Sequence, residues 1–148
     1  MITDKKVIVL QTKSVPQGIS AMIGFNPDAD EETNTASMQE AIANVRTAQV
    51  TYAVRDTTID GIEITNGQTL ALVDGKILCA NDSSSECIRA IGESFAGAAF
   101  VTMFYGASIS DEKAEKTSAI LKEKLGEETE ITLINGGQPI YDYIISAE

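Results

Sequence analysis

The chain has 148 residues, about the length of one domain, and 43% of them are hydrophobic, which is enough to form a folded core. It carries 11 lysines and arginines against 22 aspartates and glutamates, a net charge of −11. Such a surface repels phosphate backbones and anionic lipid headgroups, so we expect no nucleic-acid partner and no direct membrane insertion. The absence of histidine excludes Ser-His-Asp and Cys-His catalysis and histidine-ligated metal sites within the chain.

The apolar run near the N-terminus is too short for a membrane span and does not have the pattern of a signal peptide. We therefore expect a cytoplasmic protein. Two cysteines, Cys79 and Cys87, lack CxxC spacing and are expected to be reduced, packed thiols.

Residues 1–46 are predicted to form a strand and two helices. The β-branched run "KVIVLQT" (6–12) is typical of a strand buried on both faces of a parallel sheet. Ser14 can then cap a helix that has Pro16 in its first turn. The second helix, within residues 28–45, has an apolar face and acidic residues at its front.

The acids Asp28, Asp30 and Glu31 could alternatively belong to a calcium loop. The glycine at the sixth position and the final glutamate of such a loop are missing, so the start of a helix is favoured.

The centre of the chain reads as a β-meander. Residues 47–55 alternate, which predicts a strand with Val50, Tyr52 and Val54 on its buried face. Three further short strands are expected at residues 62–65, 69–73 and 76–80, separated by the Asn66-Gly67 and Asp74-Gly75 turns.

Helices and strands alternate in the last part of the chain. Ser83 and Glu86 form the pattern of a capping box before a helix with Ile88, Ile91 and Phe95 on one side. An apolar strand (98–106) follows, and then a helix with Ala114, Thr117, Leu121 and Leu125 on its inner face and Gly126 as its stop. The chain continues with a strand (130–134), a turn (135–139) and a final strand (140–148) with Tyr141 and Tyr143 on one face. Residues 47–148 are therefore predicted to be an α/β structure with a mixed sheet and helices packed on it.

The polar segment after the first of these central strands is the main candidate for chemistry. Arg55, Asp56 and Asp60 could bind an anion or a metal, but such pairs at strand ends are usually surface ion pairs. Thr57 and Thr58 could simply shape the loop through backbone hydrogen bonds. The residues alone favour this structural interpretation.

The other candidates also have simpler structural explanations. The pair Gly136-Gly137 is more typical of a tight turn than of an anion site. Core or interface packing is the simpler explanation for Tyr141 and Tyr143. No GxGxxG or Walker A sequence is present, and we assign no catalytic residue and no metal ligand to this chain.

Five stretches along the chain resemble, in order and spacing, the C-terminal region of the dihydroxyacetone-kinase-like proteins. These proteins are the kinase subunit of bacterial fatty acid kinase, and an older label for the region is the DAK phosphatase family. The five stretches are "TKSVPQGISAM", "NVRTAQVTYAVRDTTIDGIEI", "VDGKI", "VTMFYGASISDEKAE" and "NGGQPIYDYIISAE". The resemblance implies an ATP-dependent kinase whose nucleotide-binding domain, with ATP and Mg, lies elsewhere in the full protein. It implies no cofactor in residues 1–148, which would form a single C-terminal-type domain.

In that family the fatty acid is carried by a separate DegV-type fatty-acid-binding protein and becomes an acyl phosphate. The resemblance implies that this chain docks that partner, and that it also meets the kinase domain of its parent protein. Its most family-specific segments are Arg55 to Gly61 and Gly136, Gly137, Gln138 and Tyr141. We expect both segments to lie on one exposed side and to contribute to partner contact.

A weaker resemblance extends to the DegV-type proteins themselves, through "VIVLQTKSVPQG", the "VDGKI" hairpin and the helix that follows "VTMFYG". It implies a DegV-like (EDD-type) α/β architecture, with residues 1–46 similar to the end of a Rossmann-like subdomain. Thr12 and Ser14 stand near the position where that family holds an acyl carboxylate, but its C-terminal histidine has no counterpart here. An alternative function is therefore a small-acid or acyl-binding domain with a cleft near Thr12, Ser14 and Gly136.

Overall fold

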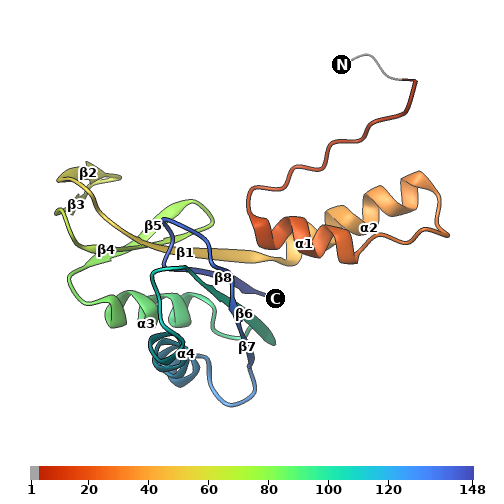
Figure 1. The fold of residues 1–148 in the computed structure, drawn as a ribbon. Helices are drawn as coiled ribbons and strands as arrows, with labels where there is room; N and C mark the ends of the chain where they lie inside the picture. The colour runs from red at the N-terminus through yellow and green to blue at the C-terminus, as the bar shows by residue number, and fades with distance from the viewer. Residues whose placement is uncertain (1–3) are drawn as a thin grey trace. The chain divides into compact units, whose positions relative to one another are not determined.

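The computed structural model describes residues 4–148, and the chain divides between Val45 and Arg46 into two compact units (Figure 1). The first unit contains helices α1 (Val15–Ile23) and α2 (Glu31–Asn44), which pack on each other. Ser14 Oγ accepts a hydrogen bond from the Gln17 N–H at 3.3 Å, as a helix cap does. The sequence-based prediction of these two helices is confirmed.

The acidic segment before α2 is a helix start. Asp30 Oδ1 accepts from the Thr33 N–H at 2.8 Å, and this bond lowers the pKa of Asp30 below its usual value. Glu31 and Glu32 occupy the first turn, where the helix dipole favours negative charge.

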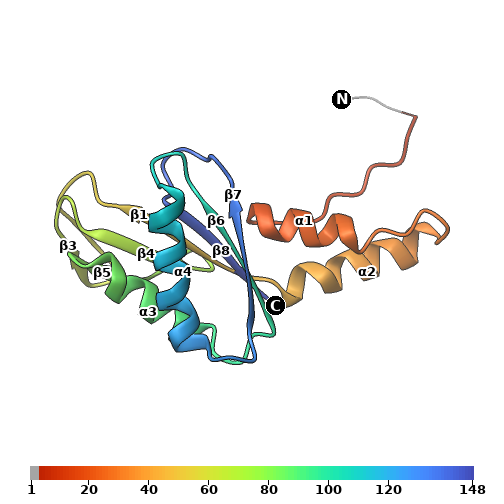
Figure 2. The same ribbon diagram turned by 60° about the horizontal axis from the view of Figure 1, so that its bottom comes forward.

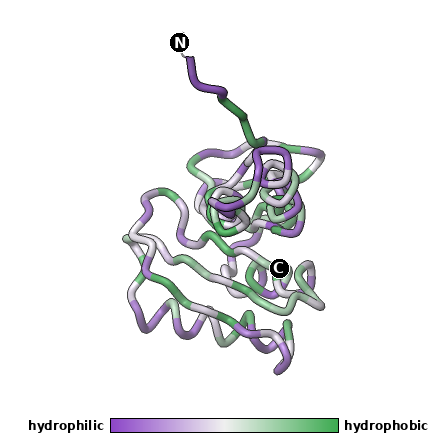
Figure 3. The backbone as a smooth tube through the Cα atoms, turned by 90° about the vertical axis from the view of Figure 1, so that its right-hand side faces the viewer, coloured by the Kyte–Doolittle hydropathy of each residue, from purple (hydrophilic) through white to green (hydrophobic). Residues whose placement is uncertain are grey.

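The predicted strand at residues 6–12 is wrong for this structure. Those residues carry no regular secondary structure, and Val7 and Val9 are 69% and 80% exposed. The run from Val7 to Leu10 is the green stretch beyond the helices near the N-terminus in Figure 3. A strand needs a neighbour to pair its backbone groups, and no strand among residues 4–148 pairs with this one.

The second unit is built on one six-stranded mixed sheet, in the order β5-β4-β1-β8-β6-β7. All neighbouring strands are antiparallel except β6 and β7, which are parallel. The α/β prediction with a mixed sheet is confirmed. The strands are β1 (Arg46–Tyr52), β4 (Thr69–Val73), β5 (Lys76–Asn81), β6 (Phe100–Tyr105), β7 (Glu130–Asn135) and β8 (Tyr143–Ala147).

Helices α3 (Ser84–Ser94) and α4 (Asp111–Leu125) lie side by side on one face of this sheet (Figures 1 and 2). Alternate residues of the strands meet the apolar sides of both helices, as a period of two in strands and 3.6 in helices requires. The core includes the predicted residues Ile88, Ile91, Phe95, Ala114 and Leu121, packed against Val50, Met103 and Ile145. Gly126 ends α4 with φ 91°, as predicted.

The capping box predicted for α3 does not form. Ser83 is the N-cap residue, but its side chain makes no capping bond. The Ser83 N–H instead donates to Asn81 Oδ1 at 2.8 Å, and the Glu86 carboxylate pairs with Arg89 at 2.6 Å. Asn81 and Arg89 therefore occupy the Ser83 N–H and the Glu86 carboxylate, which would bond to each other in a capping box.

Half of the predicted meander is present. The Asp74-Gly75 turn joins β4 to β5 with φ values of 49° and 82°, the positive values that a two-residue hairpin needs. The Asn66-Gly67 turn does not pair its flanking strands, since β3 (Ile62–Ile64) pairs with β2 (Thr57–Ile59) and β4 pairs with β1. Only Gly67 has a positive φ there, so the hairpin geometry is missing.

Two further predictions about strand faces are wrong. Strand β1 ends at Tyr52, and Tyr52 and Val54 are 54% and 78% exposed instead of buried. Strand β8 begins at Tyr143, which is buried, so Tyr141 precedes the strand and does not share its face in the predicted way. Cys79 and Cys87 are free thiols, as predicted, and the structure places them beside each other. Burial raises the pKa of Cys87 to about 12.

The strand register defines two ends of the sheet. The Arg46 end contains the start of β1, the turn between β4 and β5, and the end of β8 at Ala147. At the Tyr52 end, β1, β6 and β7 finish and β8 begins.

None of the helices in residues 4–148 is long and apolar enough to cross a membrane.

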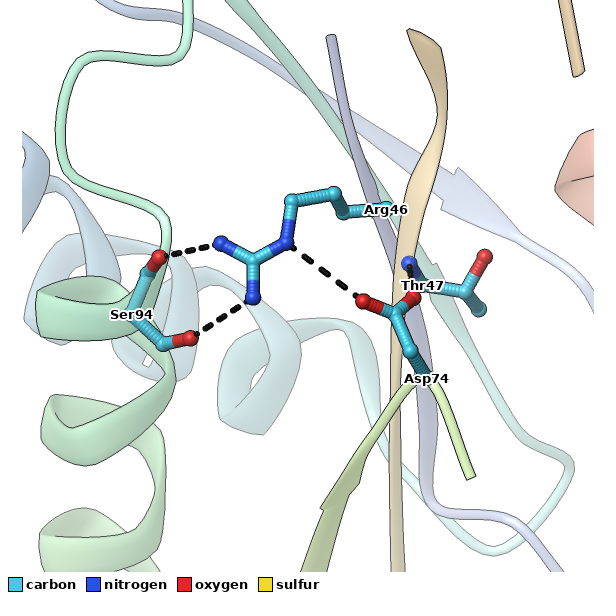
Figure 4. Close-up of polar contacts among 4 residues, drawn as sticks. All are labelled: Arg46, Thr47, Asp74 and Ser94. Carbon is cyan, nitrogen blue, oxygen red and sulfur yellow. Dashed lines mark hydrogen bonds and ion pairs between the residues drawn. The ribbon is translucent and has the colours of Figure 1, made fainter. Parts of the chain in front are cut away.

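The Arg46 end is closed by one arginine (Figure 4). Its guanidinium donates to Ser94 O at 2.6 Å and to Ser94 Oγ at 3.1 Å, and its Nε lies 3.4 Å from Asp74 Oδ2. Asp74 Oδ1 also accepts from the Thr47 N–H at 3.0 Å. The guanidinium carbon lies 5.1 Å from the centre of the Phe95 ring, a cation–π distance.

Candidate functional site

The family-specific segments emerge together at the Tyr52 end of the sheet. Residues 53–66 leave β1 after Tyr52, and residues 136–142 connect β7 to β8. The register pairs Val50 with Tyr143 and Tyr105 with both Tyr143 and Asn135. The sheet therefore places both predicted segments at one end, with the loop 106–110 between β6 and α4.

The segment 53–66 is a small hairpin closed at its base by Ala53. Its backbone exchanges hydrogen bonds with the start of the next strand, from the Ala53 N–H to Gln68 O and from the Gly67 N–H to Ala53 O, both at 2.8 Å. Asp56 Oδ1 accepts from the Asn66 N–H at 2.7 Å and closes the loop above this pair. Asp60 and Gly61 form the tip, with φ values of 52° and 80°.

Most of the predicted site residues in the hairpin have a role in forming the hairpin itself. Thr57 and Thr58 are residues of β2, paired with Ile64 and Glu63. Asp56 and Asp60 serve the closure and the tip. Arg55 is different, because it is exposed and makes no hydrogen bond or ion pair with the part of the chain that the structure describes.

The segment 136–142 folds over the end of β6. Gln138 Nε2 donates to Phe104 O at 3.2 Å and to Tyr141 O at 3.4 Å, while the Ala107 N–H donates to Gln138 O at 3.1 Å. A Cβ at Gly106 would lie 2.4 Å from Tyr141 O and 2.8 Å from Gln138 O. Glycine at position 106 is therefore what allows the segment to approach so closely.

The paired glycines have local structural roles. The N–H groups of Gly136 and Gly137 both donate to Tyr105 O, at 3.0 and 3.2 Å, so they are not free to hold an anion. A Cβ at Gly136 would lie 2.1 Å from Gln138 Oε1, and Gly137 has φ 61°. Gly136, Gly137 and Gln138 therefore each have a role within the fold. Residues 136–138 form no hydrogen-bonded turn, so the tight turn favoured for the glycine pair is not observed.

The loop 106–110 is tied to the same end. Tyr105 Oη donates to Asp111 Oδ1 at 2.8 Å in the first turn of α4, and this bond raises the pKa of Tyr105. Ser108 Oγ donates to Asp142 Oδ1 at 3.0 Å, which joins the loop to segment 136–142. Burial also raises the pKa of Tyr143, whose hydroxyl lies 2.9 Å from Thr117 Oγ1. These phenols are structural and protonated at neutral pH.

Large apolar side chains are exposed around this end. They come from β1, from the hairpin and from segment 136–142, and no pattern in the sequence groups them. They are Tyr52 (54% exposed), Val54 (78%), Ile59 (43%) and Ile140 (75%). Arg55, which has no hydrogen bond or ion pair within residues 4–148, lies between Val54 and Ile59 in the sequence. The alternating pattern of residues 50–54 is the one available signal in the sequence, and it indicates burial.

The remaining predicted residues, Thr12 and Ser14, belong to the first unit. Thr12 is exposed, and Ser14 Oγ accepts the capping bond of α1. Among residues 4–148, no three cysteine, aspartate or glutamate side chains gather as metal ligands would. The described contacts of the candidate residues therefore include no nucleophile with its base and no metal centre.

Comparisons with known proteins identify a family and several relatives along the whole length of the chain. Residues 1–148 match the FakA-like C-terminal family of fatty acid kinase. "Protein YloV" of Bacillus subtilis (strain 168) is 41% identical over 149 residues, and "Uncharacterized protein SAB1090" of Staphylococcus aureus (strain bovine RF122 / ET3-1) is 34% identical. Each alignment covers 99% of this chain, which spans 27% of either relative.

Solved structures of DegV family proteins have the same fold. The DegV family protein Cg2579 from Corynebacterium glutamicum superposes with a TM-score of 0.70 at 14% identity, covering 99% of this chain and 64% of that one. The fatty acid binding DegV family protein SAG1342 from Streptococcus agalactiae superposes with a TM-score of 0.54 at 13% identity, covering 88% and 54%. The DegV-like fold is thereby shown, and the match over the whole length assigns the chain to the FakA-like family of fatty acid kinase C-terminal domains.

Proposed function

We propose that this domain docks a DegV-type, acyl-carrying protein, so that a kinase domain elsewhere in the parent protein can phosphorylate the bound fatty acid. In that reaction the γ-phosphoryl group of ATP passes to the carboxylate and forms an acyl phosphate. ATP and Mg belong to the kinase domain in this proposal, and the system works in the cytoplasm. The contribution of residues 46–148 is to orient the partner.

The observation that carries the proposal is the Tyr52 end of the sheet. Arg55 stands exposed and unpaired within the described residues, in a chain with a net charge of −11. Exposed Tyr52, Val54 and Ile140 surround the same end. An arginine that can pair with a carboxylate at two points, among apolar side chains, is a common centre of a protein interface.

The test is the affinity of residues 1–148 for each DegV-type protein of the source organism, measured by calorimetry. We expect Arg55→Ala to weaken binding at least tenfold, about 1.4 kcal/mol, without lowering stability. Arg89→Ala is the matched control, because Arg89 is a surface arginine of α3 already paired with Glu86. The docking role of Arg55 is wrong if Arg55→Ala binds as the unmodified chain does.

A second candidate function is the binding of a small acid or an acyl chain by the domain itself. The fold is shared with a structure described as a fatty acid binding DegV family protein, which favours this candidate. Solvent extraction of the purified chain followed by mass spectrometry tests it. We expect no stoichiometric fatty acid in the extract, since the histidine of the DegV-type carboxylate site is absent, and finding one would favour the second candidate.

A further inference from the structure

Ile140, in segment 136–142, has a backbone conformation that isoleucine rarely adopts. Its φ is 72°, and the Tyr141 N–H donates to Pro139 O at 2.8 Å across it. A bond from residue i+2 to residue i around a central φ of about +75° marks the rarer and strained form of the γ-turn. A β-branched residue at positive φ is an outlier in proteins, because its branched side chain collides with its own backbone.

The strain at Ile140 is not offset by burial. The residue is 75% exposed, so its side chain gains little from the core. Among residues 4–148, the other two residues that have positive φ without being glycine are Asp60 and Asp74. Both are aspartates in hairpin turns, a residue type suited to such positions. An isoleucine at position 140 therefore lowers the stability of the isolated domain relative to asparagine or glycine.

The surrounding structure holds Ile140 in place from both sides. Thr51 Oγ1 donates to Ile140 O at 2.9 Å, and the Asp142 N–H donates to Val50 O at 2.8 Å. On the other side, Gln138 donates to Tyr141 O, and Gly106 packs directly against that carbonyl. Contacts from β1, from the residue after β6 and from the segment itself thus fix a conformation that isoleucine does not prefer.

We propose that Ile140 is the apolar anchor of the docking surface, a side chain that becomes buried in a pocket on the DegV-type partner. This inference rests on the proposed function and assigns the binding contact within it. A rigidly presented apolar side chain loses little conformational entropy on binding, which raises affinity for a matching pocket. Strain that persists at an exposed position is typical of functional sites.

The position of Ile140 favours a protein partner. Its carbonyl accepts a hydrogen bond from Thr51, which precedes exposed Tyr52 by one residue. Arg55, which has no hydrogen bond or ion pair within residues 4–148, follows Thr51 by four residues. A surface that offers an apolar pocket next to a carboxylate would complement both the anchor and the cation. Such a mixed contact, with a central apolar side chain and a charged neighbour, is common in protein interfaces.

The experiment compares three variants for stability and for binding. Ile140→Asn removes the apolar group and suits the left-handed backbone, so we expect the melting temperature to rise by about 3 °C and binding to weaken at least tenfold. Ile140→Leu keeps an apolar side chain without the β-branch, and should bind within threefold of the unmodified chain. Phe100→Ser removes an exposed apolar residue from the other end of β6 and should bind normally.

The outcomes separate this inference from the proposed function. If the unmodified chain binds no DegV-type protein, the proposed function fails, whatever the melting temperatures are. If the chain binds and Ile140→Asn binds equally well, the docking proposal stands and the anchor assignment is wrong. If Ile140→Asn only converts a dimer to a monomer in sedimentation, a second copy occupies the surface and the inference is overturned.

Discussion

The two ends of the six-stranded sheet differ in how completely their side chains are partnered. At the Arg46 end, one guanidinium bonds to Ser94 and Asp74 and lies over Phe95. At the Tyr52 end, Arg55 forms no hydrogen bond or ion pair within residues 4–148, and Tyr52, Val54 and Ile140 are exposed. Both ends have an arginine at or near an end of β1, so residue type alone does not separate them.

The difference between the ends separates a structural role from a binding role. Arg46 completes the fold by satisfying a carbonyl group at the end of α3, which a helix leaves without an internal partner. The Tyr52 end has a well-bonded backbone, but its Tyr52, Val54 and Ile140 side chains are exposed, and Arg55 has no hydrogen bond or ion pair within residues 4–148. A rigid backbone that displays unpartnered apolar and cationic groups is what a docking surface needs.

The largest expected effect concerns the rigidity of the Tyr52 end. Gly106→Ala places a Cβ against two backbone oxygens that cannot simply rotate away, so we expect a loss of about 2–3 kcal/mol in the free energy of unfolding. All four tyrosines lie in residues 46–148 and no tryptophan is present, so tyrosine fluorescence during urea unfolding reports on this unit. Gly18→Ala, in α1 with open space around it, should leave that transition unchanged. An unaffected Gly106→Ala would mean that segment 136–142 is loosely held.

The second prediction compares the two arginines directly. Arg46→Ala should lower the free energy of unfolding by about 2 kcal/mol, mostly through lost hydrogen bonds to Ser94, since its partly exposed ion pair contributes little. Arg55→Ala should change it by less than about 0.5 kcal/mol. Arg46→Lys should recover only part of the loss, because lysine lacks the planar fork. Equal effects at the two positions in urea unfolding would contradict the contrast between the ends.

The third prediction concerns Asp56, which closes the hairpin at the Tyr52 end. Asp56→Ala leaves the Asn66 N–H without its acceptor, and we expect a loss of about 1 kcal/mol in stability. Asp56→Asn keeps an acceptor oxygen and should behave nearly as the unmodified chain. Amide hydrogen exchange at Asn66 measured by NMR should be faster in the alanine variant. Unchanged exchange there would show that another group holds this loop.

The smallest expected effect is a pH dependence from Tyr105. Its pKa in the folded state is raised, chiefly by the hydrogen bond to Asp111. The stabilisation is therefore fully present below the unfolded tyrosine pKa of about 10 and is lost as pH rises through the folded pKa. Urea midpoints from far-UV circular dichroism should fall as pH rises above about 10, and less so in Tyr105→Phe. Identical curves for both proteins would exclude this contribution.

Much of the local structure could be predicted from short stretches. The Ser14 and Asp30 caps, the apolar faces of α3 and α4, and the stop at Gly126 depend on residues within about one helical turn. The Asp74-Gly75 hairpin also depends on adjacent residues. These features are predictable because the groups that satisfy them are neighbours in the chain.

The features that could not be predicted depend on partners far away in the sequence. The run at residues 6–12 has the composition of a strand, but composition does not supply a paired neighbour. The exposure of Tyr52 and Val54 follows from where β4 and β8 stop alongside β1. The family resemblance indicated that residues 55–61 and 136–141 are characteristic of the family. It did not show which of these residues stabilise the fold and which have exposed side chains.

The sequence by itself determined the helices, the Asp74-Gly75 turn, the acidic charge and the family of this chain, because each is encoded in composition or in residues close together. Only the tertiary structure decided that Arg46 is a structural group and Arg55 a displayed one, and that Ile140 is held in a left-handed conformation. The role of Arg46 depends on its hydrogen bonds to Ser94, 48 positions away in the sequence. The conformation of Ile140 depends on contacts such as the hydrogen bond from Thr51, 89 positions away. A contact at that separation has no local signal in the sequence.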